Sequence, residues 1–173
     1  MPAEVDVAVG HLRRPATVAP ALVGVDRMYL APTPETVAEV LNLAVTAGVR
    51  HVVDLSGKPE SWWGGVTRAV EASGIAWTHL WPGDFMENTF TWASQIRATG
   101  TVREPWPLGA TTPIAMDDIA AVAAAALAGD AHLGRALSLT GPGGRVGLGA
   151  VAALAVRCTM RGIARCDAPM PGR

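Results

Sequence analysis

Short apolar runs alternate with segments of helical periodicity along the first half of the chain, and this alternation most constrains the fold. His51–Leu55 is almost wholly apolar, as expected for a strand that is covered on both faces of a sheet. Glu35–Ala47 places Val37, Val40 and Leu41 on one face of a helix. We therefore expect an α/β fold with crossover helices and one parallel sheet, with strands at residues 5–9, 27–30, 51–55 and 75–80.

The second half of the chain is less regular. Phe90–Ala98 is expected to be helical, and so is an alanine-rich segment ending at Leu127, with Asp117 or Asp118 as its N-cap. Residues 111–115 and 136–140 are expected to be extended.

The charge balance changes at Gly143. Residues 143–173 hold five arginines and one acid, a net charge of +4, which leaves −5 for residues 1–142 of a chain whose total is −1. We therefore expect a main domain at 1–142 and a divergent tail at 143–173, and the fold to include a small C-terminal α/β extension. Leu148–Ala155 is a candidate helix, but residues 157–173 show no convincing period, which predicts a dispensable tail with little fixed packing.

Composition narrows the function classes. A net charge of −1 gives no electrostatic footprint for nucleic acid or a membrane surface. The chain has no leader-like start and no apolar run that would span a bilayer, so we expect a cytoplasmic location. The cysteines, Cys158 and Cys166, form no metal-ligand pattern, and His51, His79 and His132 are dispersed, so no metal site is expected.

A candidate site lies where the predicted strands end. Ile75–Leu80 runs into a Pro-Gly turn, and ligands of open parallel sheets bind at the carboxyl ends of the strands. Pro82 and Gly83 would let the backbone approach a flat ligand closely. The side chains of Asp84, Phe85 and Asn88 are candidate contacts around that ligand. Two further stretches end neighbouring strands and are expected to form the floor of the crevice: Ala31-Pro32-Thr33 and Ser56-Gly57.

The chain has no Gly-rich phosphate loop and no Tyr-x-x-x-Lys pair. Tyr29 is its only tyrosine and Lys58 its only lysine. A lysine therefore cannot stand four residues after a tyrosine to lower the pKa of the phenol and help it to pass a proton. Any redox chemistry must find its proton elsewhere.

Five segments, in order, resemble the NmrA-like, atypical short-chain dehydrogenase family of NAD(P)-binding proteins. They are GVDRMYLAP (24–32), AGVRHVVDLSG (47–57), TRAVEASGIAWTHLWPGDFMENTF (67–90), PIAMDDIAAVAAAAL (113–127) and GRALSLTGP (134–142). The resemblance implies a partial Rossmann-like sheet and NAD(P)H as cofactor. Pro82, Gly83 and Phe85 would lie beside the nicotinamide, and Asn88 and Trp92 would face the substrate.

The resemblance also exposes differences. Family members begin with a strand, a glycine-rich loop and a helix that cradle the pyrophosphate, and this sequence starts at what looks like the third strand. We therefore expect a truncated domain that binds NAD(P)H weakly or not at all. His11 stands where the family tends to carry an adenine-contacting aspartate, and we expect it to be a solvated loop histidine. The family often shows a second serine where Gly57 stands.

The resemblance favours an NAD(P)H-dependent reductase of a small carbonyl or quinone-like acceptor. One alternative is a non-enzymatic nucleotide-sensing or partner-binding regulator. Another is a truncated product with little cofactor binding, which would self-associate through an exposed sheet edge.

Several residues carry two interpretations. Asp84 is either a substrate contact or a turn or capping residue, and Asn88 and Trp92 are either substrate contacts or helix surface. Trp62 and Trp63 either line a substrate pocket or cover a core.

The absence of a Tyr/Lys pair predicts that Tyr29 is not the proton donor of any reductase activity. Tyr29→Phe should leave turnover within a few-fold of the unmodified chain. A loss on the order of 100-fold, the scale of a positioned general acid, would contradict this assignment.

Overall fold

A computed structural model describes residues 5–103, 105, 109–141 and 145–160. These residues form two compact units. The first unit comprises Met1–Trp81 and Ala120–Ser138, and the second comprises Pro82–Ile119 and Leu139–Arg173. The boundary expected between Pro142 and Gly143 lies outside the described residues and stays a prediction.

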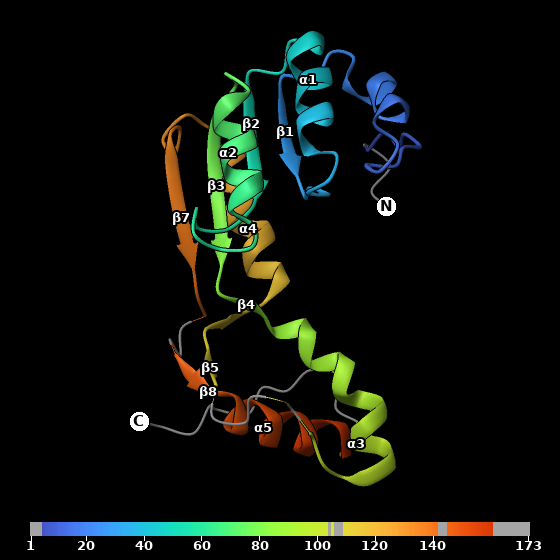
Figure 1. Cartoon of the computed structure of the whole chain (residues 1–173), viewed down its shortest axis with the longest axis vertical. Coiled ribbons are helices and arrows are strands. Elements are labelled where there is room, and N and C mark those ends of the chain that lie inside the picture. The colour runs from blue at the N-terminus through green and yellow to red at the C-terminus, as the bar shows by residue number, and fades with distance from the viewer. Residues whose placement is uncertain (1–4, 104, 106–108, 142–144, 161–173) are drawn as a thin grey trace. The chain divides into compact units, whose positions relative to one another are not determined.

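The first unit is built on a sheet of strand order β1-β2-β3-β7 (Figure 1). The strands are β1 (Arg27–Leu30), β2 (His51–Leu55), β3 (Ala76–Pro82) and β7 (Arg135–Leu139). β1 pairs with β2 and β2 with β3, both in parallel, which confirms the sheet predicted for these three segments. The register sets Asp54 of β2 opposite His79 of β3.

Helices α1 (Val37–Ala47) and α2 (Gly64–Ala72) connect these strands and pack against each other, as expected for crossover helices. α1 ends at Gly48, whose φ of 85° is the left-handed conformation that closes a helix at low cost. The predicted face of α1 is buried. The core of the unit comprises Leu22, Leu30, Val37, Val40, Leu41, Ala44, Val49, Val52, Val66, Val70 and Ile75.

The strand predicted at residues 5–9 is wrong. The segment has no regular secondary structure, and Val7 and Val9 are 70% and 95% exposed. An alternating apolar pattern becomes a strand only where a neighbouring strand accepts its hydrogen bonds, and the described residues place none beside it. The chain then forms two 3₁₀ turns, η1 (Pro15–Thr17) and η2 (Ala19–Leu22). β1 and β7 are the sheet's two edges, so the expected self-association would use one of them, and it stays a prediction.

Helix α4 (Met116–Leu127) confirms the predicted alanine-rich helix, but neither Asp117 nor Asp118 is its N-cap. Both carboxylates lie inside the first turn, where they favour the positive end of the helix dipole. The backbone N–H of Met116 instead donates to Glu87 Oε1 at 2.9 Å. A cap from 29 residues earlier in the chain cannot be read from local sequence.

The second unit contains short strands and two helices. β4 (Asp84–Phe85) pairs in parallel with β6 (Pro113–Ile114), and β5 (Ala110–Thr111) pairs antiparallel with β8 (Val146–Gly147). The 3₁₀ turns of η3 (Met86–Trp92) lead into α3 (Ala93–Thr99), which α5 (Leu148–Met160) packs against.

The expectation that residues after Gly143 have no packed role is therefore wrong for residues 146–160. β8 pairs with β5, α5 packs on α3, and Val151 on α5 is buried. The lack of a convincing period in residues 157–173 misled the prediction, because the buried Val151 lies earlier in the segment, where α5 begins. Residues 161–173 lie outside the described residues.

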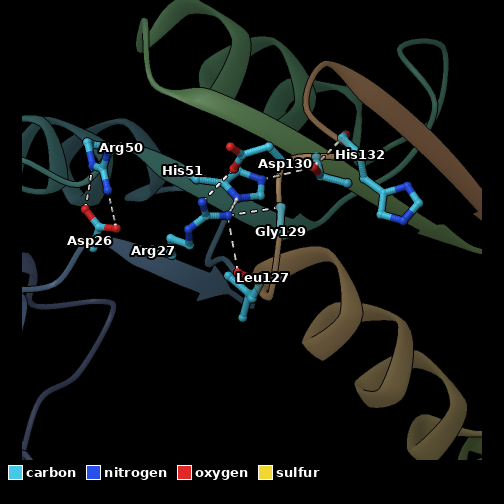
Figure 2. Close-up of polar contacts among 9 residues, drawn as sticks. Asp26, Arg27, Arg50, His51, Leu127, Gly129, Asp130 and His132 are labelled. Atoms are coloured by element: carbon cyan, nitrogen blue, oxygen red, sulfur yellow. Dashed lines mark hydrogen bonds and ion pairs between the residues drawn. The ribbon is translucent and has the colours of Figure 1, made fainter.

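Arg27 ties the start of β1 to the turn between α4 and β7 (Figure 2). Its guanidinium donates to the carbonyl oxygens of Leu127 (3.3 Å) and Gly129 (2.9 Å) and pairs with Asp130 at 2.6 Å. Backbone carbonyls at the end of a helix need such donors, because no further turn satisfies them. Arg50 makes a different contact, a bidentate pair with Asp26 at 2.5 and 2.6 Å on the exposed surface.

Beside Arg27, the buried imidazole of His51 is held in one neutral tautomer. Thr78 donates its hydroxyl proton to the carbonyl of His132 at 2.8 Å and so accepts a hydrogen bond from His51 Nε2, 3.0 Å away. His51 Nδ1 then faces Arg27 NH1 at 3.5 Å. Burial, and next the Arg27 charge, lower the pKa of His51, since a second ring proton would be desolvated and would meet a cation.

Arg27→Met should destabilise the first unit by about 1–3 kcal/mol, because two helix-end carbonyls lose their donor. Arg50→Met, the matched control, should leave the melting temperature nearly unchanged, since exposed ion pairs contribute little. Thermal unfolding followed by circular dichroism measures both. Equal losses in the two variants would show that the carbonyl contacts of Arg27 add nothing.

Candidate functional site

The carboxyl edge of the first unit's sheet carries five of the predicted cofactor residues. Ala31, Pro32 and Thr33 follow β1, and Ser56 and Gly57 follow β2. Because β1 and β2 are parallel, both stretches leave the sheet at the same edge. Ser56 N donates to Leu80 O of β3 at 3.0 Å, so its backbone is fixed by the neighbouring strand.

The side chain of Ser56 is the most suggestive polar group at this edge. It is 6% exposed, and its hydroxyl has no hydrogen-bond partner among the described residues. A buried hydroxyl without a partner loses free energy, so it favours a ligand that supplies one. Ala31 and Pro32 follow the neighbouring strand at the same edge, and the assignment of these residues and Ser56 to a cofactor stays a prediction.

Gly57 has a structural reason to be glycine. A Cβ at this position would overlap the side chains of Ser61 and Trp63, because the loop after β2 folds back over it. The Gly57 carbonyl accepts a hydrogen bond from Thr67 Oγ1 of α2 at 2.6 Å. Gly57 thus shapes the loop rather than supplying chemistry, and any larger residue would displace Ser61 or Trp63.

Pro82, Gly83 and Phe85 belong to the second unit. Gly83 N donates to Leu139 O at 2.9 Å, and a Cβ on Gly83 would overlap Thr112. Thr112 therefore lies close to Gly83 on the side where a Cβ would point, and the approach of a flat ligand to Gly83 stays a prediction. Pro82 and Phe85 are half-buried, and Phe85 pairs with Ile114 between β4 and β6.

Asp84 connects two parts of the second unit. Its Oδ1 accepts from Asn88 Nδ2 at 2.8 Å, and its Oδ2 accepts from Thr111 Oγ1 at 2.9 Å. Both carboxylate oxygens thus bind protein groups, which favours the structural interpretation of Asp84. Asn88 is exposed and Trp92 is half-buried, and their assignment to a substrate stays a prediction.

Sequence reasoning missed a buried polar pair in the first unit. Asp54 Oδ2 lies 2.6 Å from His79 Nδ1, and the two side chains are 0% and 1% exposed. Trp77 stacks on the His79 ring at 4.1 Å between centroids, and Glu71 of α2 lies 3.7 Å from His79 Nε2, too far for a hydrogen bond. The available signal was a carboxylate and an imidazole at buried positions of two neighbouring strands, Asp54 in β2 and His79 in β3.

The remaining polar candidates do not gather into a site. Burial, and next the Asp54 charge, raise the pKa of Tyr29, which disfavours the phenolate. Lys58 is exposed. His11 lies in an exposed turn where its Nδ1 accepts from Arg13 N at 3.0 Å, which confirms a loop histidine.

Metal-binding clusters and membrane-spanning helices are both absent from the described residues. These residues contain no group of three or more His, Cys, Asp or Glu side chains that could hold a metal ion. Nor does any helix among them have the length and apolar character that crossing a membrane requires.

Comparison with known proteins gives two curated relatives. The chain is 38% identical over 164 residues to the NAD(P)H azoreductase of Xenophilus azovorans, covering 87% of this chain and 57% of the relative. It is also 38% identical over 152 residues to the (4-alkanoyl-5-oxo-2,5-dihydrofuran-3-yl)methyl phosphate reductase of Streptomyces griseus, covering 80% and 54%. The chain thus spans little more than half the length of either relative.

The fold is likewise similar to a solved structure. An NADPH-dependent quinone oxidoreductase from Escherichia coli, in complex with NADPH, superposes with a TM-score of 0.76 at 22% identity. The match covers 91% of this chain and 60% of that one. No family profile matches the chain.

Asp54→Ala should lower the free energy of unfolding by about 3 kcal/mol, because it leaves His79 buried without its partner. Asp26→Ala, which breaks an exposed pair, should change stability little. Urea unfolding measures both. A loss in Asp54→Ala no larger than that in Asp26→Ala would show that the buried pair is energetically neutral.

Proposed function

We propose that this chain, which belongs to the NmrA-like family of NAD(P)-binding proteins, is an NAD(P)H-dependent reductase of a small carbonyl or quinone-like acceptor. The names of the curated relatives, an azoreductase and a reductase of a dihydrofuranone phosphate, support this class of reaction. Both names denote reductases, and the first names NAD(P)H as well. A cytoplasmic location, where NAD(P)H is abundant, is part of the proposal.

The observation that carries the proposal is the buried hydroxyl of Ser56 at the carboxyl edge of the sheet. In parallel α/β sheets this edge is where dinucleotides bind. The backbone that carries the hydroxyl is fixed by the hydrogen bond from Ser56 N to Leu80 O, and the hydroxyl itself has no partner among the described residues. The backbone at this position is therefore in place before a ligand arrives, which lowers the entropic cost of binding.

Different residues of the chain would contact different parts of the cofactor. In the first unit, Ala31, Pro32 and Thr33 would form a floor and Ser56 would donate or accept one hydrogen bond. The family resemblance assigns Pro82, Gly83 and Phe85 to the nicotinamide, and this assignment stays a prediction.

The cofactor would supply the hydride, while the protein would orient it and exclude water. Asn88 and Trp92 would contact the acceptor, with Asp84 positioning Asn88 through their 2.8 Å hydrogen bond. Tyr29 would not supply the proton, because its pKa is raised and it lies within β1.

Calorimetric titration of the purified chain with NADPH and with NADH tests the proposal. We expect weak binding, because the sequence offers no glycine-rich pyrophosphate loop, and Ser56→Ala should weaken it by about a further 2- to 10-fold, the equivalent of one hydrogen bond. Ser73→Ala is the matched control. Ser73 Oγ donates to Val70 O at the end of α2, before β3 begins, so its loss should leave affinity unchanged.

Absence of NADPH and NADH binding by a chain that still unfolds cooperatively would overturn the reductase proposal and favour a chain that does not bind the cofactor. Binding without reduction of any quinone or azo acceptor would favour a nucleotide-sensing role. Equal effects of Ser56→Ala and Ser73→Ala would remove Ser56 from the site.

A further inference from the structure

Trp62 and Trp63 form an exposed aromatic corner in the loop between β2 and α2. Trp62 is 80% exposed and Trp63 is 38% exposed. Their ring centroids lie 5.0 Å apart and the ring planes meet at 86°. Trp62 therefore does not cover a core, which was one of its two interpretations from sequence.

The corner stands on a loop that is fixed by its own hydrogen bonds. Ser61 donates to Lys58 O through both its N–H (2.8 Å) and its hydroxyl (2.7 Å), and Gly64 N donates to Ser61 O at 2.9 Å. Two bonds from α2 reach back to the loop: Thr67 Oγ1 to Gly57 O at 2.6 Å and Arg68 NH1 to Pro59 O at 3.0 Å.

The loop is also closely packed. A Cβ on Gly64 would overlap the Pro59 backbone, just as one on Gly57 would overlap Ser61 and Trp63. A loop that is braced in this way holds its side chains in place without a ligand. The indole of Trp62 is thus presented to solvent by a rigid support, which lowers the entropic cost of using it for recognition.

We propose that Trp62, backed by Trp63, is a stacking platform for an uncharged planar aromatic acceptor such as a bicyclic quinone. The proposal rests on the reductase function and names a substrate-contacting group that the resemblance does not supply. An exposed indole offers a large flat face, and stacking on it requires a planar partner. The indole of Trp63 is almost perpendicular to that of Trp62, so it would contact the edge of a ring stacked on Trp62.

Position and charge support this choice of ligand. The loop leaves β2 at the carboxyl edge of the sheet, immediately after Ser56 and Gly57. The two charged residues of the loop, Lys58 and Glu60, are both exposed and have opposite charges. The loop thus offers no net charge to an anion or a cation, and an uncharged ring system fits it better than a charged one.

The test is titration of the full chain with 1,4-naphthoquinone in the absence of NADPH, followed by calorimetry and by the indole N–H resonance of Trp62. We expect binding to shift that resonance. Trp62→Ala should weaken binding about tenfold, while Trp62→Phe should retain most of it, because a phenyl ring still stacks. Decalin-1,4-dione, the saturated and non-planar analogue, should bind weakly to every form of the chain.

The control variant is Val23→Ala. Val23 is 81% exposed, like Trp62, but it precedes β1 and lies on the amino-terminal side of the sheet. It should bind the quinone as the unmodified chain does. Because both side chains are exposed, both variants should melt as the unmodified chain does.

Three results would overturn the proposal: no naphthoquinone binding by the unmodified chain, equal binding by Trp62→Ala, or equal affinity for the saturated analogue. Loss of self-association in Trp62→Ala, with quinone affinity unchanged, would assign the corner to a second copy of the chain instead. Quinone binding by a chain that binds neither NADPH nor NADH would keep the platform and refute only the reductase function.

Discussion

The pairing of Asp54 with His79 fixes how β2 and β3 lie against each other, and the rest of the first unit depends on it. In a parallel sheet, a slip of one residue turns every side chain to the other face. Such a slip would separate the carboxylate from the imidazole, which lie 2.6 Å apart, and leave both polar groups buried without each other. Apolar side chains tolerate several registers, whereas a buried polar pair favours one. The register in turn decides that Ser56 meets Leu80 at the end of the ladder.

The two ends of this sheet differ in how completely their polar groups are satisfied. At the amino-terminal end, Arg27 bonds to backbone carbonyls, and His51 is matched to Thr78 and Arg27. At the carboxyl end, the Ser56 hydroxyl has no partner among the described residues and the indole of Trp62 is open to solvent. Stability and recognition are thus separated along the strands, as in other α/β proteins whose loops carry the function.

The parts of the second unit are connected by side-chain hydrogen bonds and not by a long sheet. Its strands are only two residues long, so ladder hydrogen bonds contribute little. Side chains connect the pieces instead, with Asp84 reaching Thr111 and Glu87 reaching the start of α4. The contacts of Asp84 thus favour the structural one of its two interpretations from sequence. Gly83 also has a structural role, because a Cβ at this position would overlap Thr112.

Sequence alone determined the three parallel strands β1, β2 and β3, the crossover helices between them and the edge at which we propose that a ligand binds. Those features follow from local periodicity and from the rule that parallel strands end at a common edge. Tertiary structure decided whatever depends on partners that are distant in the chain. No described strand lies beside residues 5–9, so this segment does not join the sheet. The start of α4 is capped by Glu87, and Asp54 pairs with His79. Tertiary structure also decided that Trp62 faces solvent, because burial is set by what packs against a side chain and not by its hydrophobicity.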